Sequence, residues 1–122
     1  MSTAARPIRR RSTFSQFRTP AGRGSAGPVQ VRYLQSAGGC ELASPSVAFA
    51  VGRRAGNAVT RNRIRRRLRA ALGQLPPGTL QNGCYLVGAG TSAAGLPFSV
   101  LVDHVERAVL GATRVADARP GR

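Results

Sequence analysis

Alternating apolar and polar positions predict three β-strands in this chain. In the first, Val29, Val31 and Tyr33 alternate with polar neighbours, which is the period of a half-buried strand. The second has one face of small residues that leaves room for a helix or a ligand, and the third follows a turn-forming Pro-Pro-Gly segment. The three predicted strands span residues 29–33, 46–51 and 83–89.

Apolar residues at helical spacing predict two longer helices. In the first helix the apolar positions fall within a stripe about 100° wide, as a helix packed on a sheet requires. In the second, near the C-terminus, the apolar positions also share one face, and Ser99 is a candidate N-cap. The stripes consist of Ile64, Leu68, Ala71, Leu72 and Leu75 in the first helix, and of Leu101, Val105, Ala108, Val109 and Ala112 in the second.

Glycine, proline and charged segments divide the rest of the chain. Residues 1–11 are basic and are expected to form a flexible arm, and the Ser-Thr pair that follows can cap a short helix. The segment Pro20–Pro28 is rich in glycine and is predicted to be a loop. We therefore expect one domain of residues 12–112, followed by a disordered tail of residues 113–122.

Charge is the strongest signal in the composition. The 122 residues include 19 arginines, no lysine and four acidic residues, for a net charge of +15. Such an excess attracts polyanions, so nucleic acid or an anionic membrane surface is the expected partner. The sequence has no signal-peptide pattern and no apolar stretch long enough to span a membrane, which predicts a cytoplasmic protein. In that compartment Cys40 and Cys84 are expected to be free thiols.

The first of the two helices carries a cationic face opposite its apolar stripe. The segment from residue 49 to 69 holds eight arginines and no acid, so ion pairs within the helix cannot explain this face. One guanidinium group can bind two phosphate oxygens at once and can stack on a base, which favours an external polyanion such as a nucleic acid over a merely solvated face or a helix lying on a membrane. Arg61 falls at the margin of the stripe, where its stem can pack. The face consists of Asn62, Arg63, Arg65, Arg66 and Arg69.

One run of the sequence resembles the signature of a known family. The residues VGRRAGNAVTRNRIRRRLR, from Val51 to Arg69, are similar to the protein subunit of bacterial ribonuclease P, where a strand ends in paired basic residues and the next helix opens with Arg-Asn-Arg. The resemblance spans roughly Arg9 to Ala112. It implies a single-domain α+β sandwich of order αβββαβα with a left-handed βαβ crossover, like domain 2 of ribosomal protein S5. The fourth strand that it requires is expected near residues 42–46 or beside one of the predicted strands.

The resemblance implies a role in the maturation of transfer RNA. The family's protein binds a large catalytic RNA, which uses Mg²⁺ to hydrolyse the phosphodiester that joins the 5′ leader to precursor tRNA, and the protein holds the leader. By resemblance, the residues that bind the catalytic RNA would be Arg61, Asn62, Arg63, Arg65, Arg66 and Arg69. The leader would lie in a cleft lined by Phe14, Phe17, Arg18, Tyr33, Arg53 and Arg54. For Phe14 and Phe17, packing in the core stays open beside base stacking.

The sequence contains no recognisable catalytic site of its own. His104 is the only histidine, and its position beside the apolar stripe of the C-terminal helix favours packing. Asp103 and Glu106 lack a third ligand for a metal site, and no catalytic triad or phosphate-binding glycine motif occurs. The resemblance implies an endoribonuclease subunit whose chemistry is carried by the RNA, without a small-molecule substrate or a membrane partner. Another small basic RNA-binding protein, such as a ribosomal or nucleoid protein, and an autonomous nuclease are the alternatives.

Overall fold

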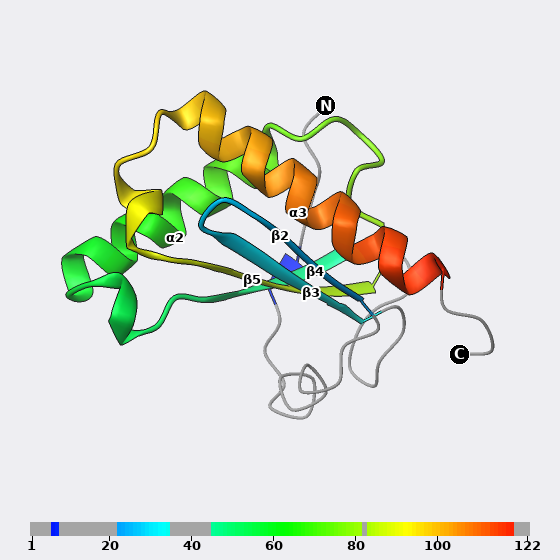
Figure 1. Ribbon diagram of the computed structural model, residues 1–122, viewed down its shortest axis with the longest axis horizontal. Helices are drawn as coiled ribbons and strands as arrows, with labels where there is room; N and C mark the ends of the chain where they lie inside the picture. Colours follow the sequence, from blue (N-terminus) through cyan, green and yellow to red (C-terminus); the bar gives the residue numbers. More distant parts are fainter. Residues whose placement is uncertain (1–5, 8–21, 35–44, 82, 119–122) are drawn as a thin grey trace.

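The computed structural model describes residues 6–7, 22–34, 45–81 and 83–118 (Figure 1). The predicted short helix after residue 12 lies outside these ranges. In chain order the described elements are β1 (Arg6–Pro7), β2 (Gly22–Ala26), β3 (Val29–Leu34), β4 (Pro45–Ala50), the 3-10 turn η1 (Arg53–Ala55), α2 (Ala58–Gly73), β5 (Gly83–Ala89), the 3-10 turn η2 (Thr91–Ala94) and α3 (Phe98–Ala118).

The strands form one mixed sheet in the order β1-β4-β5-β3-β2. β2 and β3 make an antiparallel hairpin, and β5 pairs antiparallel with β3 but parallel with β4. The chain that joins the parallel neighbours β4 and β5 runs through α2, as a βαβ unit does. Helices α2 and α3 lie together on one face of the sheet (Figure 1). The predicted α+β class with a single sheet is therefore confirmed.

Both predicted apolar stripes are buried between the helices and the sheet. The five residues of the first stripe are at most 5% exposed, and the five of α3 are fully buried. Helix α2 ends at Gly73, so the last residue of its predicted stripe, Leu75, lies just beyond the helix. The residues of both stripes share one core cluster with Val29, Val31, Tyr33 and Tyr85 from the central strands. This packing fixes the rotation of each helix, so the residues on the opposite side of α2 must face solvent.

A side-chain cap fixes the start of α2. Asn57 is the N-cap residue, and its Oδ1 accepts a hydrogen bond of 2.9 Å from the backbone N–H of Thr60. Such a cap satisfies one of the amide groups that a helix start leaves without an intrahelical partner. The first arginine of the helix, Arg61, follows directly after this capped turn.

The missing fourth strand lies in the segment that was predicted to be a loop. Residues Gly22–Ala26 form β2, which pairs with β3 and packs under α3. The prediction of a loop was therefore wrong for these residues, whereas the expectation of a fourth strand beside one of the predicted strands is confirmed. The small residues in β2 permit a close approach of the helix. A Cβ atom on Gly24 would lie 2.6 Å from the backbone nitrogen of Ala112 and would also meet the carbonyl oxygen of Ala108.

Three predicted boundaries also differ from the structure. Arg6 and Pro7 pair with β4 in parallel, although they fall in the predicted flexible arm. Helix α3 begins at Phe98, so Ser99 is inside its first turn and not its N-cap. The same helix continues to Ala118, past the expected start of a disordered tail at residue 113, and the side chain of Thr113 is buried.

Cys84 is buried at the start of β5 and is disulfide-bonded. The expectation of a free thiol was therefore wrong for this residue. The other cysteine, Cys40, lies outside the described residues.

None of the helices described here is both long enough and apolar enough to cross a lipid bilayer.

Candidate nucleic-acid interface

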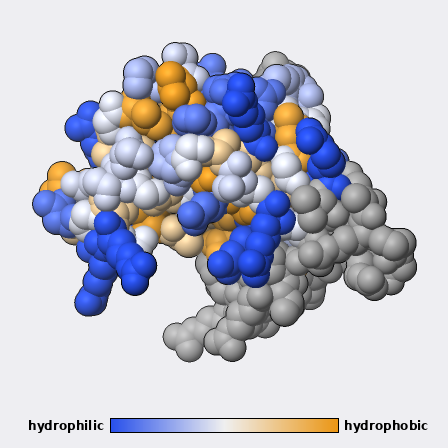
Figure 2. All heavy atoms as spheres, in the orientation of Figure 1, coloured by the Kyte–Doolittle hydropathy of each residue, from blue (hydrophilic) through white to orange (hydrophobic). Residues whose placement is uncertain are grey.

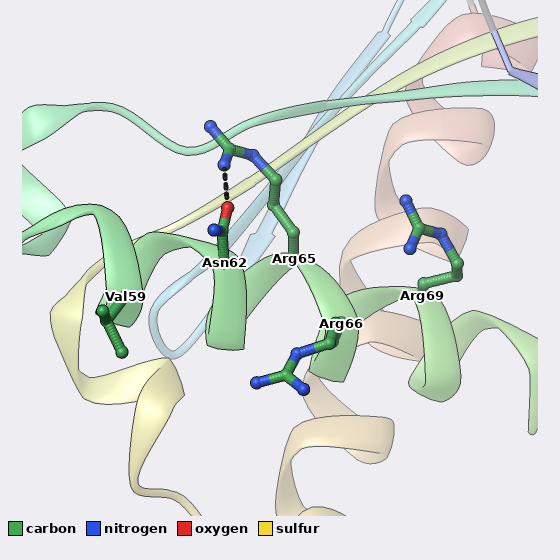
Figure 3. Close-up of a pocket in the computed structure, with 5 residues that line it drawn as sticks. All are labelled: Val59, Asn62, Arg65, Arg66 and Arg69. Atoms are coloured by element: carbon green, nitrogen blue, oxygen red, sulfur yellow. Dashed lines mark hydrogen bonds between the residues drawn. The ribbon is translucent and has the colours of Figure 1, made fainter.

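The cationic face predicted for α2 is present and turned away from the core. Asn62, Arg63, Arg66 and Arg69 are exposed, and Arg65 is half-buried. We call these five residues the arginine face. In Figure 3, Asn62 and Arg65 project to the same side of the helix and Arg66 points away from them. The guanidinium groups therefore spread over a wide sector of the helix surface.

Two arginines of this face are held by contacts to neighbouring residues. Arg65 donates a hydrogen bond of 2.9 Å from Nη1 to Oδ1 of Asn62, and another of 3.4 Å from Nη2 to the backbone oxygen of Val51. The guanidinium carbon of Arg69 lies 5.5 Å from the centre of the Phe49 ring, within the range of a cation–π contact. These contacts orient both side chains before any ligand binds, which lowers the entropy that binding costs.

The arginine face surrounds a shallow hollow of about 460 Å³. The hollow is lined by Asn62, Arg65, Arg66, Arg69 and Val59, the last of which is 75% exposed (Figure 3). The lining contains three guanidinium groups, an amide and no carboxylate. Such a set of donors suits a phosphate group, because one guanidinium group can donate hydrogen bonds to two phosphate oxygens at once.

Acidic side chains do not neutralise these cations within the described part of the chain. The ion pair described there joins Arg107 Nε to Asp103 Oδ2 at 3.2 Å, and both residues belong to α3. Figure 2 shows strongly hydrophilic side chains over much of the visible face, with scattered hydrophobic patches between them. The charge of α2 is therefore available to an external polyanion.

Two further arginines of α2 turn partly inward. Arg61 is half-buried, and its Nε is buried without a hydrogen-bond partner, which agrees with its predicted place at the margin of the stripe. Arg67, which was not assigned to the face, donates from Nη2 to the backbone oxygen of Leu96. Arg67 therefore holds the segment before α3, and its first role is in the fold.

Arg53 and Arg54 are exposed in η1, directly after β4. The turn is tied to η2, because the Thr91 hydroxyl donates a hydrogen bond of 3.1 Å to the backbone oxygen of Arg54. The arginine face reaches the same region through the contact of Arg65 with Val51. The two predicted surfaces thus adjoin at the end of β4.

Tyr33 does not belong to an open cleft. Its side chain is 1% exposed and lies in the core, with its ring centre 4.8 Å from that of Tyr85. A ring buried in this way cannot offer a face to a base, so this part of the predicted leader site was wrong. Three other candidates for the leader site, Phe14, Phe17 and Arg18, lie outside the described residues.

A second basic surface, missed from the sequence, lies on the face of the sheet opposite the helices. Val31 points into the core, so its neighbours in β3 point to the other face, and the hairpin pairs Arg32 with Arg23 and Gln30 with Ser25. All four of these polar residues are exposed, and they line a hollow of about 390 Å³. We call them the sheet surface. The alternation in β3 already indicated the orientation of Arg32, but Arg23 was assigned to a loop.

The described residues do not assemble an enzymatic site around the acidic residues or the histidine. His104 packs on the turn of the hairpin, where a Cβ on Gly27 would lie 2.6 Å from its Nε2. Asp103 is paired with Arg107 on the surface of α3. No group of three or more His, Cys, Asp or Glu residues that could hold a metal occurs in the part of the chain the structure describes.

The sequence and the fold match known proteins. A family model described as Ribonuclease P matches residues 3–113. The Ribonuclease P protein component of Bartonella quintana is 35% identical over 114 residues, covering 88% of this chain and 83% of that protein. The Ribonuclease P protein component of Symbiobacterium thermophilum is 37% identical over 95 residues, covering 78% and 76%. The structure of the Staphylococcus aureus RNase P protein has a TM-score of 0.67 at 18% identity, covering 87% of this chain and 94% of that one, so the fold is shared.

Proposed function

The chain belongs to the ribonuclease P protein family, and from that premise we propose that its two basic surfaces hold two different RNAs. As a member of this family it is the protein component of an endoribonuclease that processes tRNA. The arginine face binds the catalytic RNA of that enzyme. The sheet surface, together with Arg53 and Arg54, binds the 5′ leader of precursor tRNA.

The single observation that carries the first assignment is the acid-free arginine face itself. Its guanidinium groups lie on a helix that is rigidly packed through its opposite side, and two of them are oriented by contacts within the protein. A rigid cationic surface of this kind fits a folded RNA, whose phosphates also have fixed positions. The neutral Asn62 supplies a donor and an acceptor among these cations.

The second assignment rests on the register of the sheet. Ala50, Gly88 and Gln30 are neighbours across β4, β5 and β3, and Gln30 is paired in turn with Ser25. This row of small or polar residues crosses the face opposite the helices, from the end of β4 to the hairpin. An extended single strand following the row would have Arg53 and Arg54 near one end and the arginines of the sheet surface near the other. Arginines at both ends suit a backbone that carries one negative charge per nucleotide.

In this proposal the RNA carries out the cleavage and holds the Mg²⁺ ions. The described residues do not provide a ligand set for the metal, so we assign no step to a protein-bound ion. The protein contributes by binding the 5′ leader, which increases the fraction of bound precursor tRNA that is correctly placed for cleavage by the RNA. We also propose a cytoplasmic location, without a small-molecule substrate or a membrane partner.

Reconstitution tests this division of labour. The full-length protein is incubated with precursor tRNA and Mg²⁺, with and without ribonuclease P RNA. We expect no specific cleavage until the RNA is added, and then removal of the 5′ leader. Specific cleavage by the protein alone, abolished by His104→Ala or Asp103→Asn, would overturn the proposal in favour of an autonomous nuclease.

A further inference from the structure

A second hollow lies between α2 and the start of α3. It measures about 280 Å³ and is lined by Arg63, Arg66, Arg67, Ala70 and Phe98. Arg66 also lines the hollow of the arginine face, so the two hollows adjoin at this residue. A ligand bound to the arginine face can therefore extend to the first turn of α3.

Phe98 is the unusual member of this lining. Its side chain is 40% exposed at the first position of α3, whereas the tyrosines of the described residues, Tyr33 and Tyr85, are buried. A single exposed apolar residue is ordinary on a protein surface. This one, however, stands beside three arginines, and the first turn of its helix carries no acid. An aromatic ring next to guanidinium groups is the combination with which proteins bind unpaired nucleotides.

Arg67 and its neighbours have different roles in this hollow. Arg67 donates a hydrogen bond to the backbone oxygen of Leu96, two residues before Phe98, so it anchors the segment that carries the ring. Arg63 and Arg66 are exposed. Neither of them forms an ion pair within the described part of the chain, where the ion pair joins Arg107 to Asp103 on α3. One arginine therefore positions the aromatic ring, and two remain available for phosphate.

We propose that this hollow receives one unpaired nucleotide of the catalytic RNA. The base stacks on the ring of Phe98, and Arg63 and Arg66 bind the adjacent phosphates. A base within a duplex presents only its edge, so a stacking site requires a nucleotide that has left the helical stack. The inference rests on the proposed binding of the catalytic RNA to α2, and it adds that part of the contact is with a single-stranded position.

Substitutions of Phe98 in the full-length protein test the proposal through the affinity for ribonuclease P RNA. Phe98→Leu keeps an apolar side chain but removes the aromatic face, and it should weaken binding by about 5- to 150-fold, the factor equivalent to about 1–3 kcal/mol for one stacked base. Phe98→Tyr should bind like the unchanged protein. The matched control is Leu110→Ala, which removes a similarly exposed apolar side chain from the same helix and should leave the affinity unchanged. Thermal unfolding by circular dichroism identifies any variant that has lost its fold.

Ultraviolet cross-linking provides a readout that a merely structural role of Phe98 would not produce. The complex of the unchanged protein with ribonuclease P RNA should give a peptide containing Phe98 joined to one unpaired nucleotide, identified by mass spectrometry. Equal affinities of the Phe98→Leu and unchanged proteins, or a cross-link to precursor tRNA in its place, would overturn the inference. If Arg63→Ala and Arg66→Ala weaken binding while Phe98→Leu does not, only the stacking site fails. If the unchanged protein does not bind ribonuclease P RNA at all, the proposed function fails with it.

Discussion

The salt dependence of RNA binding can be calculated from the arginine face. Four arginines of this face, Arg63, Arg65, Arg66 and Arg69, have guanidinium groups at or near the surface. Each phosphate neutralised by such a group releases bound counterions, and the logarithm of the binding constant then falls by about 0.7–0.9 per contact for each tenfold rise in salt. Four contacts give a slope of about 3, so affinity should fall about 50- to 150-fold between about 50 and 200 mM salt.

Removing one arginine should change this slope by a definite amount. Arg66→Ala should lower it by about 0.7–0.9, because one phosphate contact is lost. The matched control is Arg107→Gln, which removes the same charge from a guanidinium group that is paired with Asp103 on α3. This control should leave the slope nearly unchanged, since its charge is already compensated within the protein.

The assay is equilibrium binding of the full-length protein to labelled ribonuclease P RNA at several KCl concentrations and constant Mg²⁺. The slope of the logarithm of affinity against the logarithm of salt concentration is compared among the three proteins. A slope near zero for the unchanged protein would refute the electrostatic reasoning. An equal loss of slope in Arg66→Ala and Arg107→Gln would refute the assignment to α2, because it would show that total charge and not the arginine face determines binding.

Three other substitutions test the leader site and the fold. Arg53→Ala should reduce the preference for leader-bearing over mature tRNA more than the affinity for ribonuclease P RNA, measured by competition binding; the reverse pattern would argue against two surfaces. Gly24→Ala should lower the free energy of unfolding in urea by about 1–3 kcal/mol or more, because the new Cβ meets the backbone of α3, whereas Gly73→Ala, with open space around its Cβ, should not. Asn57→Ala should cost about 1 kcal/mol through loss of the helix cap, and Asn62→Ala, which is not a cap, should leave stability nearly unchanged.

Helix faces were predictable from the sequence, whereas one strand was not. The stripes on α2 and α3 follow from apolar residues repeated over several turns, and burial in the structure agrees with every predicted position. Strand β2 lacks large apolar residues and contains two glycines, so no alternation marks it. Those small residues serve the close packing of α3 at Gly24, which is a tertiary contact that a local pattern does not reveal.

The candidate site shows the same division between local and tertiary information. The arginine face could be predicted because each of its members lies on one helix. Tyr33 was placed on the leader site although its alternation with Arg32 put it on the apolar face, and the structure shows that this face is covered by helices. The pairing of Arg32 with Arg23 depends on the register of the two strands. The approach of Phe98 to α2 depends on the path of the chain between β5 and α3.

Site-specific cross-linking from Val59 tests the central claim most directly. This side chain is highly exposed within the hollow of the arginine face, so a photoreactive phenylalanine analogue can replace it without removing an arginine. After irradiation with ribonuclease P RNA, we expect adducts to a confined set of nucleotides, and few or none when the same analogue replaces Leu110 on α3. Absence of RNA adducts from position 59, or equal yields from both positions, would contradict the conclusion that α2 holds the catalytic RNA.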